Sequence, residues 1–387
     1  MNNLILGYKR GYYRCQAIAK ALAKFQQKST IITDEDNLDT IKGDYDRIFT
    51  MSESLLPLQL KLEEKLGIGT LTETTVDILT NKFKFDELVR HFDSNMAPLS
   101  ICPTCPEDLD IFEDKSVYVK PVVGSGTKDQ YGDFRYTAFK SKEDLLAASG
   151  TKLFETWQDP DFNNATNSFI VQEYLPTHSD IYALYVYINS SGIAQPIYWC
   201  TSRLNIEQRN VTDWQPRNTS FEGIPENEVP TKVKEVALPF YQEVADALQL
   251  KSIFVVADFY YFNGIVKYID VNPRIGQGLV LLDNACDNEL IASMLAEDAL
   301  PALPRSLWKE SRLKPGKIKH VTEYKQIPGV NIESNWDLYN GLVIPEEYCL
   351  SSQDFHFSLF VTGKEKTDMY ETYRSSHNQL QACIEYY

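Results

Sequence analysis

The feature that most limits the fold of this chain is a pair of β-rich runs that flank Asn263 and Gly264. The runs cover residues 253–262 and 265–272, and an Asn-Gly pair between such runs predicts a β-hairpin. Side chains alternate between the two faces of a strand. The apolar residues expected to face a core are Val255, Ala257, Phe259, Ile269 and Val271. The polar residues expected on the opposite face are Asp258, Asp270, Asn272 and Arg274.

The length of the hairpin loop decides whether the two aspartates meet. A two-residue Asn-Gly loop pairs positions whose numbers have an odd sum, which places Asp258 and Asp270 on opposite faces. A three-residue loop, in which the glycine is left-handed and forms a bulge, pairs positions whose numbers have an even sum. We predict the three-residue loop, because the alternative turns the two carboxylates towards the core.

Two carboxylates and an amide oxygen on one sheet face are the oxygen ligands that Mg²⁺ prefers. Like charges this close repel each other unless a cation lies between them. The alternative interpretation is a solvated polar strand face, but Asp and Asn are poor strand formers. We therefore predict a magnesium site at Asp258, Asp270 and Asn272.

A lysine and a glycine-rich loop form a second pattern. Lys120 lies inside the β-rich run 117–123, and Gly124, Ser125 and Gly126 follow it. Backbone N–H groups in such a loop can bind phosphate oxygens, and a nearby lysine adds a positive charge. The loop lacks the Lys-Ser/Thr ending of a P-loop, so on this pattern alone a plain turn is an equal alternative.

The remaining elements predict a mixture of α/β and α+β structure. Near the N-terminus, short strands alternate with helical patterns, which predicts a small parallel α/β layer. The expected strands of this layer are 4–7, 30–33 and 47–50, and the expected helices are 13–25 and 53–66. Further helices are expected at 74–92, 142–149 and 229–248, and further strands at 169–175, 181–188 and 193–201. Residues 305–387 are expected to form a small α+β unit with a strand at 357–361 and a closing helix at 364–386.

Composition limits the classes of function. With 38 Lys and Arg against 54 Asp and Glu, the formal net charge is −16, which disfavours a nucleic-acid backbone or an anionic membrane as partner. No stretch approaches ~18 uninterrupted apolar residues, and the start lacks the pattern of a signal peptide. Seven scattered cysteines fit a reducing cytoplasm better than a disulfide framework. Cys102 and Cys105 form a lone CxxC without a second ligand pair, so inert thiols are expected rather than zinc.

The order of these patterns resembles the ATP-grasp superfamily, of the carboxylate–amine ligase type found in biotin carboxylase and amino-acid ligases. A lysine in a helix, Val-Lys-Pro before a glycine loop, Gln-Glu-Tyr-Leu, and Asp-Val-Asn-Pro-Arg on a hairpin follow one another within residues 78–280. The resemblance implies a three-part architecture, with an antiparallel sheet following the lid. Its parts are an N-terminal parallel α/β domain at 1–78, an ATP-grasp core at 79–300 with a mobile lid at about 115–172, and a C-terminal α+β subdomain at 301–387.

The resemblance also implies a role for each matching residue. The phosphate-binding lysines are Lys82, with Lys84 as the alternative, and Lys120, which also acts in catalysis. The phosphate loop is Gly124, Ser125 and Gly126, the adenine hinge is Glu173, Tyr174 and Leu175, and the ribose acid is Asp180. The Mg²⁺ ligands are Asp258, Asp270 and Asn272. Arg274 stabilises the acyl phosphate and the tetrahedral intermediate. For Arg203, a contact with the nucleotide and no contact are equal alternatives.

The chain departs from the family pattern at two places. The second metal-binding acid is usually Glu, and here it is Asp270. A shorter side chain bridges two ions less easily, so one or two Mg²⁺ ions, or Mn²⁺ as a substitute, stay open. Residues 128–133 lengthen the glycine loop, which leaves open the backbone groups that contact the γ-phosphate.

The function that the resemblance implies is an ATP-dependent ligase that joins a small-molecule carboxylate to an amine through an acyl phosphate, with release of ADP and phosphate. A phosphotransferase, a carboxylase that uses bicarbonate, and a nucleotide-binding module without catalysis are the alternatives. Substrate choice is expected in residues 203–222 and 276–287, and a homodimer through the N-terminal lobe stays open. The expected protein is cytoplasmic, without nucleic-acid or membrane partners.

Overall fold

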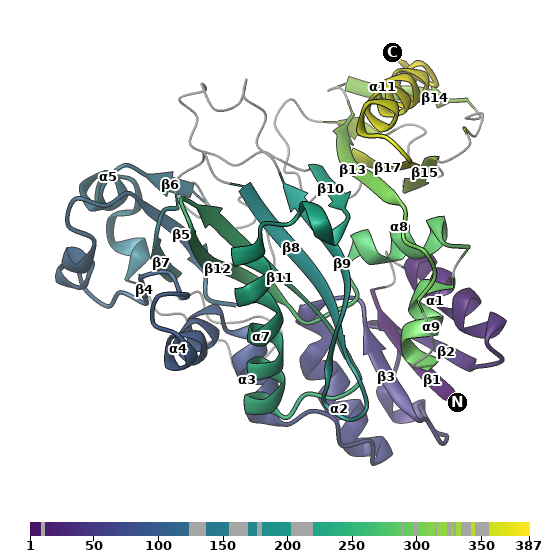
Figure 1. Ribbon diagram of the computed structural model, residues 1–387, viewed down its shortest axis with the longest axis horizontal. Helices are drawn as coiled ribbons and strands as arrows, with labels where there is room; N and C mark the ends of the chain where they lie inside the picture. The colour runs from purple at the N-terminus through teal and green to yellow at the C-terminus, as the bar shows by residue number, and fades with distance from the viewer. Residues whose placement is uncertain are drawn as a thin grey trace.

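The computed structural model describes residues 1–8, 12–123, 137–154, 169–175, 180–202, 220–287, 289–296, 300–313, 316–322, 327, 330–333, 342–344 and 356–387. Within these residues, a parallel N-terminal sheet, a large antiparallel sheet and two smaller sheets form a mixed α/β architecture (Figure 1). The predicted fold class is confirmed.

The N-terminal elements form the predicted parallel α/β layer. Strand β1 lies between β2 and β3, and all three run parallel. Their buried Leu and Ile side chains pack with those of α2 into one small core. The elements are β1 (Asn2–Gly7), α1 (Tyr12–Lys24), β2 (Lys28–Thr33), β3 (Arg47–Thr50), the 3₁₀ turn η3 (Glu53–Leu55) and α2 (Leu56–Leu66).

The helical segment predicted at 74–92 is two helices, α3 (Glu73–Thr80) and α4 (Lys82–Phe92). Asn81 interrupts it, with an extended backbone (φ −105°, ψ 104°). Its side-chain oxygen accepts the Lys84 N–H at 3.0 Å, which caps α4. The break therefore makes Lys82 the first residue of α4.

The central sheet has the strand order β12-β11-β8-β9-β10-β13-β17-β15, and every neighbouring pair is antiparallel. Figure 1 shows α7 in front of this sheet. The strands are β8 (Asp180–Ile188), β9 (Ala194–Ser202), β10 (Ser220–Ile224), β11 (Ile253–Phe262), β12 (Ile265–Asn272), β13 (Arg305–Arg312), β15 (Val330–Glu333) and β17 (His356–Gly363). The helices that follow or join them are α7 (Thr231–Leu248), α8 (Gln277–Ala285) and α9 (Leu290–Ala296).

Two hydrophobic layers hold helices against the two faces of the central sheet. On one face, α3, α4 and α7 pack on the strands, and Phe240 of α7 contacts Phe259 and Tyr268 with ring centroids 5.4 and 5.8 Å apart. On the other face, α1, α8 and α9 cover Phe254 and Val256 of β11. Because side chains alternate along β11, the even-numbered residues belong to the α8 side.

The turn of the β11–β12 hairpin is shorter than predicted. Phe262 pairs with Ile265, so the turn contains only Asn263 and Gly264. Both turn residues have positive φ, 50° and 81°, which is the conformation that an Asn-Gly pair favours in a two-residue hairpin. The predicted three-residue loop is therefore wrong.

A β-bulge further along the hairpin nevertheless brings the two aspartates together. Phe259 pairs with Tyr268, the next pair is Asp258 with Asp270, and Ile269 has no partner across the ladder. An extra residue in one strand shifts the register by one, so the aspartates share a face. Ile269, predicted in the core, is therefore only half-buried, and Tyr268 lies in the core in its place.

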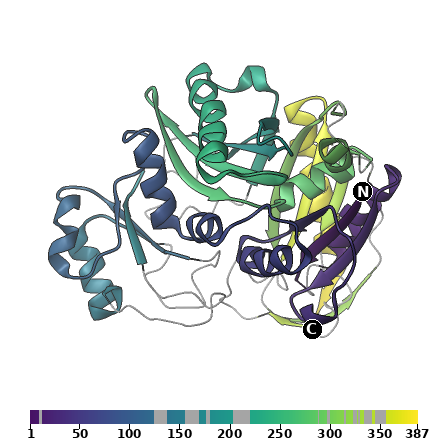
Figure 2. The ribbon, with the colours of Figure 1, turned by 90° about the horizontal axis from the view of Figure 1, so that it is seen from below.

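The lid region forms a small antiparallel sheet with the order β4-β7-β5-β6. Seen from below, it lies at the opposite end of the molecule from the C-terminal strands (Figure 2). It has a hydrophobic core of its own. Its elements are β4 (Ser100–Ile101), β5 (Val117–Pro121), β6 (Thr137–Phe139), α5 (Lys142–Ser149) and β7 (Phe169–Glu173).

The C-terminal residues partly extend the central sheet, because β13 pairs with β10 and β17 pairs with β13. Helix α11 (Lys366–Ala382) packs on these strands. The predicted closing helix ends there, and Ile384 is buried in strand β18 instead, so the helix prediction is wrong beyond Ala382. A small sheet joins β14 (Gly316–Val321), β16 (Val343–Ile344) and β18 (Ile384–Tyr386).

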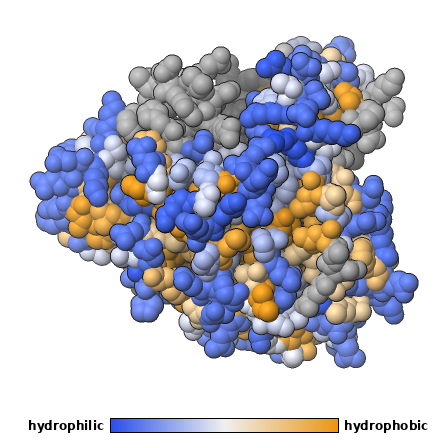
Figure 3. Space-filling view, viewed as in Figure 1, coloured by the Kyte–Doolittle hydropathy of each residue, from blue (hydrophilic) through white to orange (hydrophobic). Residues whose placement is uncertain are grey.

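The length and apolar character of the helices, and the distribution of hydrophobic residues on the surface, are the features relevant to membrane contact. None of the described helices is long and apolar enough to cross a bilayer. On the face shown in Figure 3, hydrophobic residues lie in small groups among hydrophilic ones. Such scattered apolar residues are normal for a protein surface.

Tyr241 on α7 joins the helix to the strands beneath it. Its hydroxyl accepts a hydrogen bond from the Ala257 N–H at 2.6 Å and donates one to the Leu184 carbonyl. We expect Tyr241→Phe to lower the free energy of unfolding by about 1–3 kcal/mol, because buried backbone groups lose their partner. Urea denaturation measures this loss. The control is Tyr261→Phe. It removes a hydroxyl from strand β11 beneath α7 and keeps the edge-on ring contact with Tyr182. Equal stability of the two variants would contradict this role.

Candidate active site

The two aspartates of the hairpin face each other across the β-ladder. Asp258 on β11 lies opposite Asp270 on β12, and Asn272 follows two residues further along the same strand. Asp270 Oδ1 is buried and accepts no hydrogen bond within the part of the chain that the structure describes. A buried carboxylate oxygen beside a second carboxylate suits a bound cation. The structure thus brings together all three predicted oxygen donors.

The surroundings of Asp258 alter its ionisation. Burial raises the pKa of Asp258 to about 7, and the negative charge of Asp270 adds to this effect. The positive charges of Arg274 and Lys120 lower the pKa of Asp258 but do not cancel the rise. Near neutral pH, this pair therefore favours either a retained proton or a bound cation.

Arg274 follows the hairpin and turns back towards it. Its Nη2 donates to Asn272 Oδ1 at 3.3 Å, and its backbone N–H donates to the Asn272 carbonyl at 3.0 Å. The next residue, Ile275, donates its N–H to the Thr50 carbonyl at 3.4 Å, at the end of β3. This contact ties the arginine and its loop to the N-terminal sheet.

Two glycines leave room for Tyr185 beside this arginine. A Cβ atom at Gly278 would lie 2.7 Å from the Tyr185 hydroxyl oxygen, and one at Gly276 would lie 3.1 Å from the Tyr185 ring. The same point at Gly276 is 3.6 Å from Arg274 Nη1. The phenol and the guanidinium therefore lie near each other, and the start of α8 requires glycine to pass beside them.

Lys120 reaches the hairpin from the lid. The side chain is buried on β5, and its Nζ donates to the Ile269 carbonyl at 3.1 Å. Ile269 is the bulged residue, so the irregularity that aligns the aspartates also supplies the acceptor for this lysine. Burial lowers the pKa of Lys120, and the charges of Asp270 and Asp86 oppose that change.

Lys82 reaches the same aspartate from the start of α4. Its Nζ lies 3.7 Å from Asp270 Oδ1 and 4.0 Å from Glu53 Oε1. Lys84, the alternative phosphate lysine, instead pairs with Asp77 at the surface. Of the two lysines, the structure therefore brings Lys82 to the aspartates.

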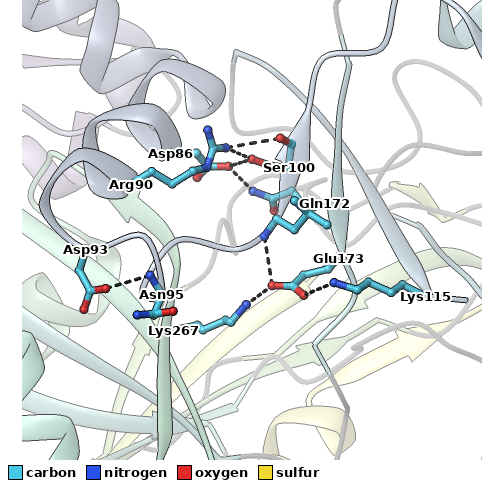
Figure 4. Close-up of polar contacts among 10 residues, drawn as sticks. Asp86, Arg90, Asp93, Asn95, Ser100, Lys115, Gln172, Glu173 and Lys267 are labelled. Carbon is cyan, nitrogen blue, oxygen red and sulfur yellow. Dashed lines mark hydrogen bonds and ion pairs between the residues drawn. The ribbon is translucent and has the colours of Figure 1, made fainter. Parts of the chain in front are cut away.

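Glu173 connects the lid to the central sheet (Figure 4). Its Oε1 accepts the Leu99 N–H at 3.0 Å and pairs with Lys267 of β12, while its Oε2 lies 3.7 Å from Lys115 Nζ. Burial raises the pKa of Glu173, but the lysines and the N–H outweigh this effect, and the pKa lies below its ordinary value. The carboxylate predicted to meet adenine is therefore engaged in a contact between lid and sheet.

A second polar group joins α4 to the lid. Asp86 Oδ2 accepts hydrogen bonds from Ser100 Oγ at 2.7 Å and from Gln172 Nε2 at 2.6 Å (Figure 4). Arg90, one turn further along α4, contacts the same serine. Burial raises the pKa of Asp86, and the charge of Lys120 opposes this rise. These bonds hold two lid strands against the helix that carries Lys82.

The remaining predicted residues lie around this centre or outside the described part. Tyr174 donates its backbone N–H to the Ser116 carbonyl at 2.8 Å, and Leu175 follows it. Asp180 begins β8 and accepts a hydrogen bond from the Tyr182 hydroxyl at 3.3 Å. The predicted residues that lie outside the described residues are Gly124, Ser125, Gly126 and Arg203.

The two cysteines of the CxxC pattern differ in chemistry from the charged residues described above. Cys102 and Cys105 are both free thiols. Burial raises the pKa of Cys102 to about 12, so its thiol stays protonated near neutral pH and is a weak nucleophile. Among the described residues, no group of three His, Cys, Asp or Glu side chains is arranged to hold a metal.

Sequence reasoning missed three charged residues of the site: Glu53, Asp86 and Lys267. Asp86 lies four residues after Lys82, on the same face of a helix, so helical spacing was a usable signal. Lys267 joins the polar face of β12 only because of the bulge, and Glu53 comes from another part of the chain. These two carry no local signal.

Comparison with known proteins gives matches in structure alone. No family model matches the sequence, and no curated protein matches it. The structure of an L-amino acid ligase from Bacillus licheniformis matches with a TM-score of 0.69 at 12% identity, over 100% of this chain and 99% of that one. A biotin carboxylase from Campylobacter jejuni matches with a TM-score of 0.65 at 13% identity, over 99% and 92%. An N5-carboxyaminoimidazole ribonucleotide synthetase from Thermotoga maritima matches with a TM-score of 0.63 at 13% identity, over 99% and 98%.

These structural similarities extend over nearly all of the chain, and at such low sequence identity they are evidence for the fold alone. Because the matches extend over nearly all of the chain, they include the parallel N-terminal sheet, the small lid sheet and the central antiparallel sheet described above. The chain therefore has the ATP-grasp fold, as the order of its motifs predicts.

Proposed function

We propose that this protein is an ATP-dependent carboxylate–amine ligase, which forms an amide bond through an acyl phosphate and releases ADP and phosphate. The observation that carries the proposal is the pairing of Asp258 with Asp270 across the bulged hairpin. Lys82 and Lys120 approach this pair from α4 and from the lid, and Arg274 stands at the end of the hairpin. Such a set of charges suits the transfer of a phosphoryl group.

The similar structures support the type of bond formed. They include an L-amino acid ligase and a phosphoribosylglycinamide synthetase. They also include N5-carboxyaminoimidazole ribonucleotide synthetases in complex with ADP. We extend nucleotide dependence and ligase activity from these enzymes to the present chain as part of the proposal.

The proposed ATP site lies between the lid and the central sheet. Lys82 and Lys120 bind phosphate oxygens as positive point charges. The backbone of Tyr174 and Leu175 meets the adenine, because the Glu173 carboxylate is bound to lysines. Asp180 binds the ribose.

The aspartate pair fits a divalent cation such as Mg²⁺. Asp270 Oδ1 is a buried oxygen without a hydrogen-bond donor among the described residues, and burial and its neighbour's charge hold Asp258 at a raised pKa. Asp258, Asp270 and Asn272 would hold the cation. When bound, Mg²⁺ supplies charge neutralisation on the ATP phosphates. One or two ions are compatible with the shorter Asp270.

The proposed reaction has two chemical steps. A carboxylate oxygen of the substrate attacks the γ-phosphorus, the bond to the β–γ bridging oxygen breaks, and ADP leaves. The amine then attacks the acyl phosphate carbonyl, loses its proton, and displaces phosphate to give the amide. Lys82 and Lys120 neutralise charge on the phosphoryl group in the first step. In the second step, Arg274 stabilises the tetrahedral oxyanion, an effect worth up to roughly 3–4 kcal/mol for one donor.

A phosphate-release screen with Mg-ATP tests the proposed function. We expect release only when both a carboxylate and an amine are present, with a product mass equal to their sum minus one water. Amino acids in pairs, small carboxylates with amines, and bicarbonate with amines make up the panel, and mass spectrometry identifies products. A product heavier by one phosphoryl group would replace the ligase with a phosphotransferase. Absence of ADP or ATP binding would reject both.

Removal of the Asp270 charge tests the metal and phosphate assignment. We expect Asp270→Asn to slow ADP formation by roughly a hundredfold or more, because charge that is organised for the reaction is lost. Initial rates of ADP release under saturating substrates measure the effect. The control is Asp110→Asn, which removes an exposed lid carboxylate that pairs with Lys142 at 2.7 Å. A near-normal rate in Asp270→Asn would remove this residue from the site.

The raised pKa of Asp258 predicts a pH dependence of metal binding. A cation must displace the proton that Asp258 retains up to about pH 7. We expect the affinity for Mn²⁺, as the probe, to fall about tenfold per pH unit below 7 and to level off above it. Electron paramagnetic resonance of free Mn²⁺ measures this. In Asp258→Asn, binding should be weak and independent of pH.

The raised pKa of Asp258 also predicts that folding stability depends on pH, in the direction opposite to the affinity for Mn²⁺. Because the folded pKa of Asp258, about 7, lies above the ordinary 3.8, folding stability without a cation is lost as pH rises between these values. Mn²⁺ should restore it. An affinity of the wild-type protein for Mn²⁺ that does not change across this range would contradict the assignment of Asp258 as ligand.

A further inference from the structure

We propose that Glu53 is a positioning residue for Lys82, through which the N-terminal α/β layer contributes to the nucleotide site. The inference rests on the proposed role of Lys82 in phosphate binding. Glu53 begins the 3₁₀ turn η3, which follows strand β3 of the parallel sheet. It lies outside every motif that the resemblance identifies.

The ion pair between these residues is buried. Lys82 Nζ lies 4.0 Å from Glu53 Oε1, and the two side chains are only 9% and 6% exposed. A buried carboxylate requires a partner of opposite charge or a hydrogen-bond donor. In the described part of the chain, Lys82 is the one cation within 4.0 Å of Glu53. Among these described residues, Lys82 is therefore the group that compensates the charge of Glu53.

Both backbones of the pair are held by neighbouring parts of the fold. Lys82 donates its N–H to the Val122 carbonyl at 2.8 Å, next to the lid strand that carries the second lysine. The end of β3 is held through the Thr50 carbonyl, which accepts the Ile275 N–H at 3.4 Å. With both ends held, the Glu53 contact governs mainly the position of the Lys82 ammonium group.

A second carboxylate, that of Asp270, competes with Glu53 for Lys82. Asp270 Oδ1 lies 3.7 Å from Lys82 Nζ, on another part of the chain from Glu53. If Asp270 were the sole acid nearby, the flexible lysine would close on it. Lys82 would then be withdrawn from phosphate, and Asp270 would lose an oxygen for a cation. Glu53 balances this attraction and keeps both groups available.

A second electrostatic effect has the opposite sign. The negative charge of Glu53 repels ATP phosphates through space, so its loss would by itself tighten nucleotide binding. Positioning of Lys82 predicts weaker binding when Glu53 is neutralised. The direction of the change in affinity therefore distinguishes the two roles.

Glu53→Gln keeps the shape of the side chain and removes its charge. We expect the affinity for ADP in the presence of Mg²⁺ to fall about tenfold, since Lys82 loses a buried partner of opposite charge. The affinity for adenosine, which has no phosphate, should not change. Isothermal titration calorimetry measures both, and circular dichroism confirms that the variant is folded. Glu53→Asp, which retains the charge, should recover part of the ADP affinity.

A double-mutant cycle tests whether Glu53 acts through Lys82. Lys82→Met should weaken ADP binding, and in this background Glu53→Gln should add no further loss. Glu63→Gln is the matched control, because Glu63 is a buried acid of the same α/β layer, 1% exposed, that accepts the Leu71 N–H at 2.8 Å. It should lower stability and leave ADP affinity unchanged.

The outcomes separate this inference from the function on which it rests. Unchanged or tighter ADP binding in Glu53→Gln would overturn it, and so would an equal loss of adenosine binding. A full effect of Glu53→Gln in the Lys82→Met background would also overturn it. If the wild-type protein itself fails to bind ADP, the proposed function falls, and this inference falls with it.

Discussion

Repulsion between Asp258 and Asp270 is the constraint on which the rest of the site depends. The two carboxylates are held opposite each other by a bulge in an otherwise regular hairpin. The same bulge exposes the Ile269 carbonyl, which accepts a hydrogen bond from Lys120. One irregularity of the backbone therefore creates the acidic pair and positions a compensating cation. The strain of bringing like charges together is relieved when positive groups or a cation approach.

Each boundary around this centre is crossed by a buried or partly buried charge. Glu173 of the lid pairs with Lys267 of the central sheet, and Glu53 of the N-terminal layer lies near Lys82. Asp86 on α4 accepts hydrogen bonds from the lid. Burial makes such groups costly when their partners are removed. The relative placement of the three parts therefore depends on the same electrostatic contacts that organise the site.

Local patterns predicted much of this fold, and contacts between distant residues account for the rest. The bounds of β11 and β12 follow from β-rich runs and an Asn-Gly turn. The bulge could not be found in this way, since the sequence allowed two registers and a longer loop gave the same parity. The motif residues on the hairpin, α4 and β5 were found because each has a local context. Glu53 was missed because its role exists only when the N-terminal layer meets α4.

The low sequence identity to the similar structures is consistent with this difference between features set by local sequence patterns and features set by contacts between distant residues. At 12% identity over the full chain, an ATP-grasp fold persists because its core positions require apolar residues of suitable size rather than particular ones. The proposed chemistry requires a small set of charges at fixed positions, and these come from the hairpin, the lid and α4. A contact such as Glu53–Lys82 belongs to neither group. It adjusts one functional side chain from outside the motifs, so it can differ between enzymes that share the fold and thereby alter nucleotide affinity without changing the architecture.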